Sequence, residues 1–472
     1  MGTIETTIRS LNEVSAASEK SEMAEVDTSL IYKHLKDEFQ AKGLPVEVDF
    51  RQMVDWVKLG DQQTHQIHPY PAKLLPNIAN FFVRATALMP HEKKVLDPFC
   101  GSGTVALESS LAGATPYVAD ANPLALLITK VKTTSYDPLE LGDELNRIVS
   151  RAKRYRKAPD IAIVNAHHWY PESQKKNLEI LLRSVMEVED ESLRDFFRVC
   201  FSVVARRLSY ADQAISVPVK LKTKDRFSGL VNQRIQDRIN WVETASVLEE
   251  YRRVCVTNIE RTALANRTNP NRESAIVVSD DARNLTNSPL ANKEFIDSKG
   301  VPLIITSPPY GSAQKYIRAS SLSLNWLGFV GPTQLTTLED KSIGREHAPH
   351  HRRTNLEEIK LPKAYDDVLL AIRKTNETRY IITKQYLLEM RRSLQEMAKV
   401  TCQGGHVVLV LGNNQVCNQV LRNDQFAIDV MNDAGMNLEL SLIDHIKSRG
   451  LMTKRNRTAS VISRESVLVF SR

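Results

Sequence analysis

Hydrophobic positions along the chain follow two different periods, and the change of period marks out the expected elements. Between about residues 90 and 135, short apolar runs at Val95–Leu96 and Tyr117–Ala119 alternate with stretches whose apolar residues recur at helical spacing. Short buried strands that alternate with helices are typical of βαβ units in a parallel sheet. The pattern therefore predicts an α/β fold.

A long helical stretch interrupts this α/β pattern. From 138 to 270 apolar residues keep helical spacing without strand alternation, as in "SQKKNLEILLRSVM". Strand-like runs then return in "SAIVVSD", "VPLIITSPPY", "GGHVVLVLGNN" and "SVLVF". We therefore expect one sheet interrupted by a large insertion. The expected units are an N-terminal arm and helix (1–50), the first part of the sheet domain (51–137), the helical insertion (138–270) and the second part (271–472), with an irregular loop at 312–360.

Composition indicates which partners this protein is expected to bind and which classes of protein it does not resemble. The 472 residues carry a net charge of +7, which favours a polyanionic partner such as nucleic acid. None of the five cysteines forms a C-x-x-C pair, so we expect a reducing cytoplasm and neither a zinc ribbon nor disulfides. The sequence contains no run of about 18 apolar residues, so no membrane span is expected. The N-terminus lacks the pattern of a secretory signal.

The first motif with candidate chemistry is "VLDPFCGSGT", in which a strand ends at Asp97. Gly101 and Gly103 permit a tight turn and a close approach of the backbone to a ligand. Open α/β sheets bind ligands at the carboxyl ends of their strands, beside this kind of turn. A purely structural glycine turn before a helix is the alternative.

Two acidic turns follow later strands. In "YVADANPLA", Asp120 ends the next strand, 23 residues after Asp97, where an acidic side chain typically accepts hydrogen bonds from ribose hydroxyls. Asn122, ahead of Pro123, fits a helix N-cap. In "VVSDDARNL", Asp280 or Asp281 suits the amino group of an adenine ring, although an Asp pair at a strand end is more often a turn or a cap.

The stretch "LIITSPPYGSAQKY" ends a buried strand with two prolines. Suppose that the substrate is an exocyclic amino group on a nucleobase: this nitrogen is a poor nucleophile, so its methylation needs fixed hydrogen-bond acceptors. The Ser307 hydroxyl and the Pro308 carbonyl supply acceptors, and Pro308 and Pro309 stiffen the turn that carries them. Tyr310 can stack on a flipped base. A stiff loop that merely closes the strand is the alternative.

Together "DPFCGSGT", "DANPLA" and "TSPPY" resemble the amino-group DNA methyltransferases that use S-adenosylmethionine, specifically the S-P-P-Y group. "HPYPAK" resembles the cofactor-side motif of that family, "RASSLSLNWLGF" the motif that follows its catalytic turn, and the C-terminal stretch its closing hairpin. The resemblance implies a Rossmann-like methyltransferase sheet that carries the helical insertion. In this family S-P-P-Y usually accompanies methylation of cytosine N4.

The resemblance, together with the turns described above, supplies the expected site residues. The expected catalytic residues are Ser307, Pro308, Pro309 and Tyr310. Residues expected to bind S-adenosylmethionine are Tyr70, Ala72, Lys73, Asp97, Pro98, Phe99, Gly101, Gly103, Thr104, Asp120, Asn122 and Asp281.

The chain leaves open which segment reads the target. Between 201 and 272 there are 13 Lys and Arg against 7 Asp and Glu, so most of the net charge lies there. A second basic stretch, "GREHAPHHRRTN", contains His347, His350 and His351, but no Cys or carboxylate spacing supports a metal. Candidate DNA contacts are Lys220, Lys222, Lys224, Arg226, Arg345, Arg352 and Arg353.

The predicted function is site-specific DNA methylation at cytosine N4, with the target base flipped out of double-stranded DNA. The expected location is a prokaryotic cytoplasm, in association with the nucleoid. A restriction–modification system, with a cognate endonuclease as a second partner, is the expected context. Methylation of adenine N6 or of an RNA base stays open, as does a DNA-binding protein of this fold without catalysis. A cytosine C5 mechanism is set aside, because no cysteine lies in a P-C turn.

Overall fold

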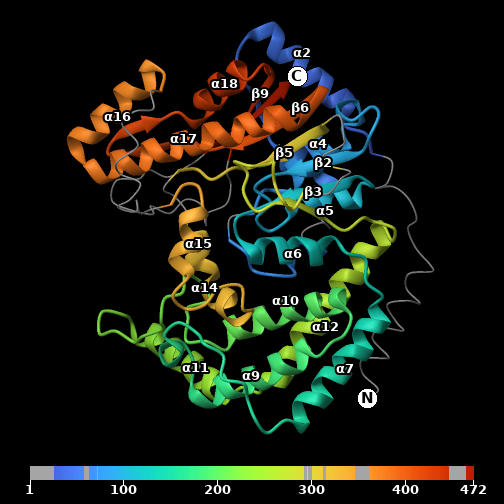
Figure 1. Cartoon of the computed structure of the whole chain (residues 1–472), viewed down its shortest axis with the longest axis vertical. Coiled ribbons are helices and arrows are strands. Elements are labelled where there is room, and N and C mark those ends of the chain that lie inside the picture. The colour runs from blue at the N-terminus through green and yellow to red at the C-terminus, as the bar shows by residue number, and fades with distance from the viewer. Residues whose placement is uncertain are drawn as a thin grey trace.

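The computed structural model describes residues 26–57, 63–71, 73–291, 295, 300–311, 315–345, 361–445 and 464–472. At its centre lies an eight-stranded sheet with the order β1-β9-β10-β6-β5-β2-β3-β4 (Figure 1). The strands are β1 (Val46–Val48), β2 (Lys94–Asp97), β3 (Thr115–Ala119), β4 (Ile276–Ser279), β5 (Val301–Thr306), β6 (Thr401–Leu411), β9 (Asn437–His445) and β10 (Arg464–Ser471). A separate hairpin consists of β7 (Asn414–Val416) and β8 (Gln419–Leu421).

Parallel pairing dominates the sheet. Only β10 runs antiparallel, between β6 and β9, while β1–β9, β2–β3, β3–β4, β2–β5 and β5–β6 are parallel. The chain moves outward from β2 through β3 to β4, then returns to β5 on the other side of β2. The expected α/β, Rossmann-like methyltransferase sheet is confirmed. The reversal between β2 and β5 is the topological switch at which such sheets bind ligands.

Strand residues alternate between two hydrophobic layers, as the period of two requires. Leu303 and Ile305 face one layer, which includes Phe81 from α4 (Pro76–Arg84). Ile304 faces the other layer, which includes Leu387 from α17 (Glu377–Val400). The remaining helices around the sheet are α2 (Ser29–Lys42), α3 (Phe50–Met53), α5 (Thr104–Leu111), α6 (Pro123–Thr133), α16 (Lys363–Thr375) and α18 (Asn423–Asp433), with the short 3-10 helices η2 (Thr64–Gln66) and η3 (Thr86–Leu88).

The segment from 138 to 270 forms a helical layer below the sheet (Figure 1). Its helices are α7 (Pro138–Arg154), α8 (Ala166–Trp169), α9 (Glu172–Met186), α10 (Glu191–Arg207), α11 (Gly229–Thr244) and α12 (Val247–Thr268). Phe197 and Phe201 of α10 share one hydrophobic cluster with Ile128 of α6 and Trp326 of α14 (Tyr316–Trp326). Because this core is continuous with helices of the sheet region, the helical layer supports α6 and α14; the division into domains stays a prediction.

Local signals explain where the helix after β3 begins. Asn122 accepts a hydrogen bond from the Leu124 amide (3.1 Å), and Pro123 occupies the first helical position. The expected N-cap role of Asn122 is therefore present. No helix in the described ranges is both long enough and apolar enough to cross a bilayer.

The turn after β2 depends on two glycines with positive φ, +48° at Gly101 and +71° at Gly103. A Cβ atom added to Gly103 would lie 2.5 Å from Thr129 Oγ1 of α6. The turn therefore needs glycine at Gly103 both for its backbone conformation and for the close packing of α6 on α5.

We expect Gly103→Ala to lower the free energy of unfolding by about 2–5 kcal/mol, because left-handed strain adds to overpacking. The matched control is Gly113→Ala, which has φ +76° but open space around the new Cβ and should cost about 1–2 kcal/mol. Urea unfolding midpoints measure both. In a Thr129→Ala background, Gly103→Ala should lower the free energy of unfolding by less than it does in the unaltered protein, because part of the clash is removed. Equal losses of unfolding free energy in Gly103→Ala and Gly113→Ala would contradict the packing argument.

Candidate functional site

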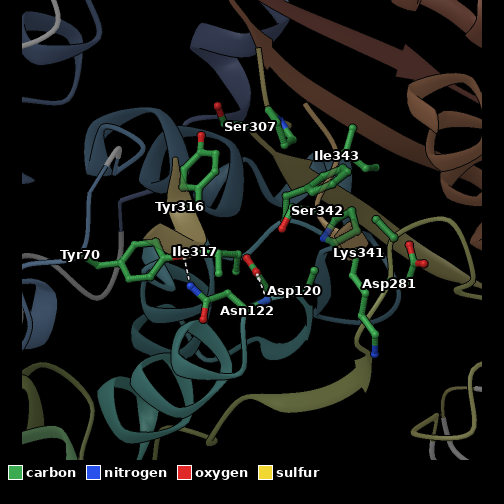
Figure 2. A pocket seen from close by; sticks show the side chains of 16 residues that line it. Tyr70, Asp120, Asn122, Asp281, Ser307, Tyr316, Ile317, Lys341, Ser342 and Ile343 are labelled. Carbon is green, nitrogen blue, oxygen red and sulfur yellow. Dashed lines mark hydrogen bonds between the residues drawn. The ribbon is translucent and has the colours of Figure 1, made fainter. Parts of the chain in front are cut away.

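The carboxyl ends of β2, β3, β4 and β5 surround one pocket at the topological switch (Figure 2). Many of the residues expected from the sequence line it. These are Tyr70, Pro98, Phe99, Gly101, Asp120, Asn122, Asp281, Ser307 and Pro309. The structure thus brings the glycine turn, both acidic turns and the proline turn into one site, although about 200 residues separate the first motif from the last.

Asp120 is the central acidic group of this pocket. Its carboxylate accepts hydrogen bonds from the Gly101 amide and the Asn122 amide, both at 2.8 Å. Burial raises the pKa of Asp120 to about 6, and the two amide donors only partly offset that effect. Asp120 therefore holds the glycine turn in place and also presents a carboxylate to the pocket.

Asp97 lies behind the pocket wall and is not among its lining residues. It accepts hydrogen bonds from Thr306 Oγ1 (2.7 Å) and the Phe99 amide (3.1 Å), which joins the end of β2 to the end of β5. Burial raises the pKa of Asp97 to about 7. Asp97 thus forms a structural link between the two strands that flank the switch, and its expected cofactor contact stays a prediction.

Asp281 lines the pocket but is also tied to an ion-pair network. Its carboxylate pairs with the Arg283 guanidinium (2.8 Å), which also reaches Glu389 of α17 (3.0 Å). The Arg345 guanidinium approaches the same Glu389 at 2.6 Å, and only 4% of its side chain is exposed. Arg345 is thus buried and paired inside the molecule, and the DNA contact expected there stays a prediction.

The S-P-P-Y turn is held from several sides. Ser307 and Pro309 line the pocket, whereas Pro308 is buried. The Tyr386 hydroxyl of α17 donates to the Pro309 carbonyl (2.9 Å). The Tyr310 hydroxyl lies 3.1 Å from Ser307 Oγ and donates to Glu465 (2.9 Å), and Tyr310 is not among the residues that line this pocket. Stacking of Tyr310 on a base therefore stays a prediction.

Several expected cofactor residues lie outside the pocket lining. Lys73 donates to the His65 carbonyl (2.8 Å), and Thr104 is buried at the start of α5. Gly103 packs against Thr129, as described above, and Ala72 lies outside the described residues. Lys73, Gly103 and Thr104 thus shape the glycine turn and the loop before it, and their expected cofactor contacts stay predictions.

One wall of the pocket consists of residues that the sequence motifs did not indicate. That wall comes from the start of α14, from the last residue of α15 (Leu335–Lys341) and from the turn that follows, and it consists of Tyr316, Ile317, Lys341, Ser342 and Ile343 (Figure 2). The stretch "RASSLSLNWLGF" gave a helix signal just after Tyr316. Nothing in the local pattern indicated that the turn after α15 folds back over the strand ends.

The basic residues predicted to contact DNA fall into three groups. Lys222, Lys224 and Arg226 are exposed in the loop before α11, and Lys220 is half-buried with its amine 4.9 Å from the Tyr210 ring centroid. Arg345 is buried. The remaining two, Arg352 and Arg353, lie outside the described residues, as do the three histidines of the same stretch.

Comparisons with known proteins agree with this fold and site. The family model described as "RMKL-like, methyltransferase domain" (UPF0020) matches residues 65–165, which include the glycine turn and Asp120. With the sheet and its pocket, this match supports a methyltransferase. The Type II methyltransferase M.MvaI of Kocuria varians is 24% identical over 372 residues, covering 75% of this chain and 77% of that protein.

A second relative, the Type II methyltransferase M.MjaII of Methanocaldococcus jannaschii, is 29% identical over 96 residues. The aligned region covers 20% of this chain and 18% of that protein. Both relatives therefore carry the same class of activity in their names, and the first matches most of the chain.

The buried carboxyls predict a specific pH dependence of stability. Because the pKa of folded Asp97 lies at about 7, above its ordinary value of 3.8, the folded state holds this proton more tightly than the unfolded state. The free energy of unfolding should therefore fall as pH rises from about 4 to 7, by at most about 1.4 kcal/mol per pH unit for one group. Asp97→Asn cannot ionise and should show a shallower fall in urea titrations at each pH.

Asp280→Asn is the matched control for that titration, because the Asp280 side chain is 53% exposed and pairs only at 3.5 Å with Lys341. It should retain the pH dependence of the unaltered protein. Parallel curves for Asp97→Asn and the unaltered protein would contradict the assignment.

Proposed function

We propose that this protein is an S-adenosylmethionine-dependent DNA methyltransferase that modifies an exocyclic amino group, with cytosine N4 as the favoured target. The observation that carries the proposal is the convergence of Ser307 and Pro309 with Gly101, Asp120 and Asp281 around one pocket. The first pair belongs to the expected catalytic turn and the other three to the expected cofactor turns. One pocket thus combines both halves of the reaction.

The pocket residues fit the chemistry of S-adenosylmethionine. Asp120 offers a carboxylate to ribose hydroxyls, and Phe99 and Ile343 offer apolar surface to an adenine ring. Gly101 brings backbone to the pocket without a side chain; a Cβ there would lie 3.6 Å from the Tyr70 ring. When bound, the cofactor supplies an electrophilic methyl group on sulfur.

Ser307 supplies the hydrogen-bond acceptor for the N–H groups of the target amino group. The lone pair of a base amino group is delocalised into the ring, so acceptors that bind its N–H groups favour the geometry from which nitrogen attacks. A serine hydroxyl on a turn fixed by two prolines needs little reorganisation to do this. Proximity and orientation of the two substrates would contribute much of the rate enhancement.

The finer assignments rest on the S-P-P-Y sequence and on the relatives. S-P-P-Y favours cytosine N4 over adenine N6 in the family that the motifs resemble. The relatives are named Type II methyltransferases, which supports a restriction–modification context for this chain. Adenine N6 methylation is the second candidate, because the pocket would suit either amino group.

The DNA-facing surface is proposed to include the loop before α11. Lys222, Lys224 and Arg226 are exposed there, and the Lys224 amine and Arg226 guanidinium lie within 5.3 and 5.6 Å of the Phe227 ring centroid. In Figure 1 this loop projects from the same side of the molecule as α14 and α15. Exposed cations beside aromatic rings suit phosphates and unstacked bases.

The test of function is expression in a bacterial host that lacks DNA methylation, followed by nucleoside mass spectrometry. N4-methylcytosine in the host DNA is the expected result, and N6-methyladenine would favour the second candidate. Ser307→Ala should lower the methylation rate about 100-fold with nearly unchanged cofactor affinity. Asp120→Ala should mainly weaken cofactor binding, about 10–100-fold by calorimetry, because a charged hydrogen bond is lost.

Asp280→Asn again serves as the control, since it lies one residue from the pocket-lining Asp281 without lining the pocket. It should leave both the rate and the cofactor affinity within about twofold. Equal loss of cofactor affinity in Ser307→Ala and Asp120→Ala would contradict the separation of roles, and DNA without any methylated base would contradict the function.

The proposed DNA surface predicts a change in salt dependence. Alanine at Lys222, Lys224 and Arg226 together should reduce the slope of log affinity against log salt by about 0.9 for every phosphate that these side chains neutralise. Fluorescence anisotropy with a DNA duplex measures this slope. The control is a triple alanine variant at Arg147, Lys153 and Arg154, which are exposed on α7; an equal change in both triples would indicate a general charge effect and contradict a local contact.

A further inference from the structure

The Ser307 hydroxyl is the first member of a hydrogen-bonded chain that runs from the pocket into the sheet. The Tyr310 hydroxyl lies 3.1 Å from Ser307 Oγ and 2.9 Å from Glu465 Oε1. Glu465 belongs to β10, the antiparallel strand between β6 and β9. The pocket is thus connected to a carboxylate that neither the motifs nor the comparisons indicate.

The chemistry of these groups fixes the direction of the protons. A carboxylate only accepts, so the single Tyr310 proton goes to Glu465; the Val410 carbonyl, 3.4 Å from the same hydroxyl, is the weaker alternative acceptor. With its proton committed, Tyr310 can only accept from Ser307. Ser307 therefore donates away from the pocket, and the remaining lone pairs of its oxygen are left to accept a hydrogen bond.

We propose that Glu465 is a positioning residue that makes Ser307 a hydrogen-bond acceptor for the target amino group and takes up the proton released by methylation. This inference rests on the function proposed above. As the N–C bond forms and the C–S bond breaks, the nitrogen must lose one N–H proton. That proton moves to Ser307 Oγ, the serine proton moves to Tyr310, and the tyrosine proton moves to Glu465, so charge and protons balance.

The surroundings of the chain suit this transfer. Burial raises the pKa of Glu465, as does the facing carboxylate of Asp444, its register partner on β9, while the Tyr310 hydroxyl lowers it. Burial also raises the pKa of Tyr310 well above its usual range, with further contributions from Glu465 and from Tyr316 of α14. The phenol therefore stays protonated and acts as a link, while Glu465 is the group that gains the proton.

The turn that carries the chain has little freedom to move. Tyr386 binds the Pro309 carbonyl, and Asn414 donates to the Gly311 carbonyl (3.0 Å). A Cβ at Gly311 would lie 2.9 Å from the Tyr386 ring, so the backbone and α17 are in close contact. The alignment of Ser307, Tyr310 and Glu465 is therefore built into the packing.

The test measures single-turnover methyl transfer to DNA across pH for Glu465→Gln and Tyr310→Phe. Both should lower the rate about 100-fold, the lower limit for general acid–base effects. Cofactor and DNA affinities should stay within about twofold. In the unaltered enzyme the rate should fall at acidic pH as Glu465 becomes protonated; this acidic limb should be absent in both variants and should return in Glu465→Asp.

Glu439→Gln is the control for the loss of a tyrosine-bound carboxylate on the neighbouring strand β9, because Glu439 accepts from the Tyr32 hydroxyl (2.7 Å), pairs with Lys36 (2.6 Å) and does not line the pocket. It should retain the rate and the acidic limb. A Glu465→Gln enzyme with the unaltered rate and pH profile would overturn the proposal, as would an equal rate loss in Glu439→Gln. If the unaltered enzyme transfers no methyl group to any DNA, the proposed function itself fails, which is a different result.

Discussion

The site depends on one constraint, the meeting of parallel strand ends at the switch between β2 and β5. Because both strands run in the same direction, their carboxyl ends lie at one edge, and the chain leaves them on opposite sides. The hydrogen bond from Thr306 to Asp97 ties these two ends together. The glycine turn and the proline turn are therefore neighbours, whatever the length of chain between them.

The helical layer contributes to the site indirectly. Its α10 packs in one cluster with α6, which begins at the pocket, and with α14, whose first residues line the pocket. His68 lies 2.8 Å from Ser202 of α10, and that serine donates to Ser323 of α14 (3.0 Å). Burial lowers the pKa of His68 to about 3, so this link is neutral. The insertion thus stabilises the wall that faces the strand ends.

Buried carboxyls give the site its electrostatic character. Asp97 and Asp120 both have raised pKa values because they are buried at the strand ends. Hydrogen bonds from backbone amides or a hydroxyl offset only part of the cost of burying each carboxylate, and Asp120 keeps acceptor oxygens at the pocket despite that cost. The proposed role of Glu465 extends the same pattern to a third carboxyl, placed behind the catalytic turn.

The sequence alone determined the α/β sheet and much of the pocket, because apolar periodicity and glycine, acidic and proline turns are local signals. Tertiary structure decided the rest. Arg345 looked like a surface cation, but Glu389 and burial hold it inside; Lys341, Ser342 and Ile343 gave no local sign of their place in the pocket wall. Glu465 resembles any polar residue in a strand until β10 is paired with its neighbours. Such contacts join residues far apart in sequence, so only the packing of the whole chain specifies them.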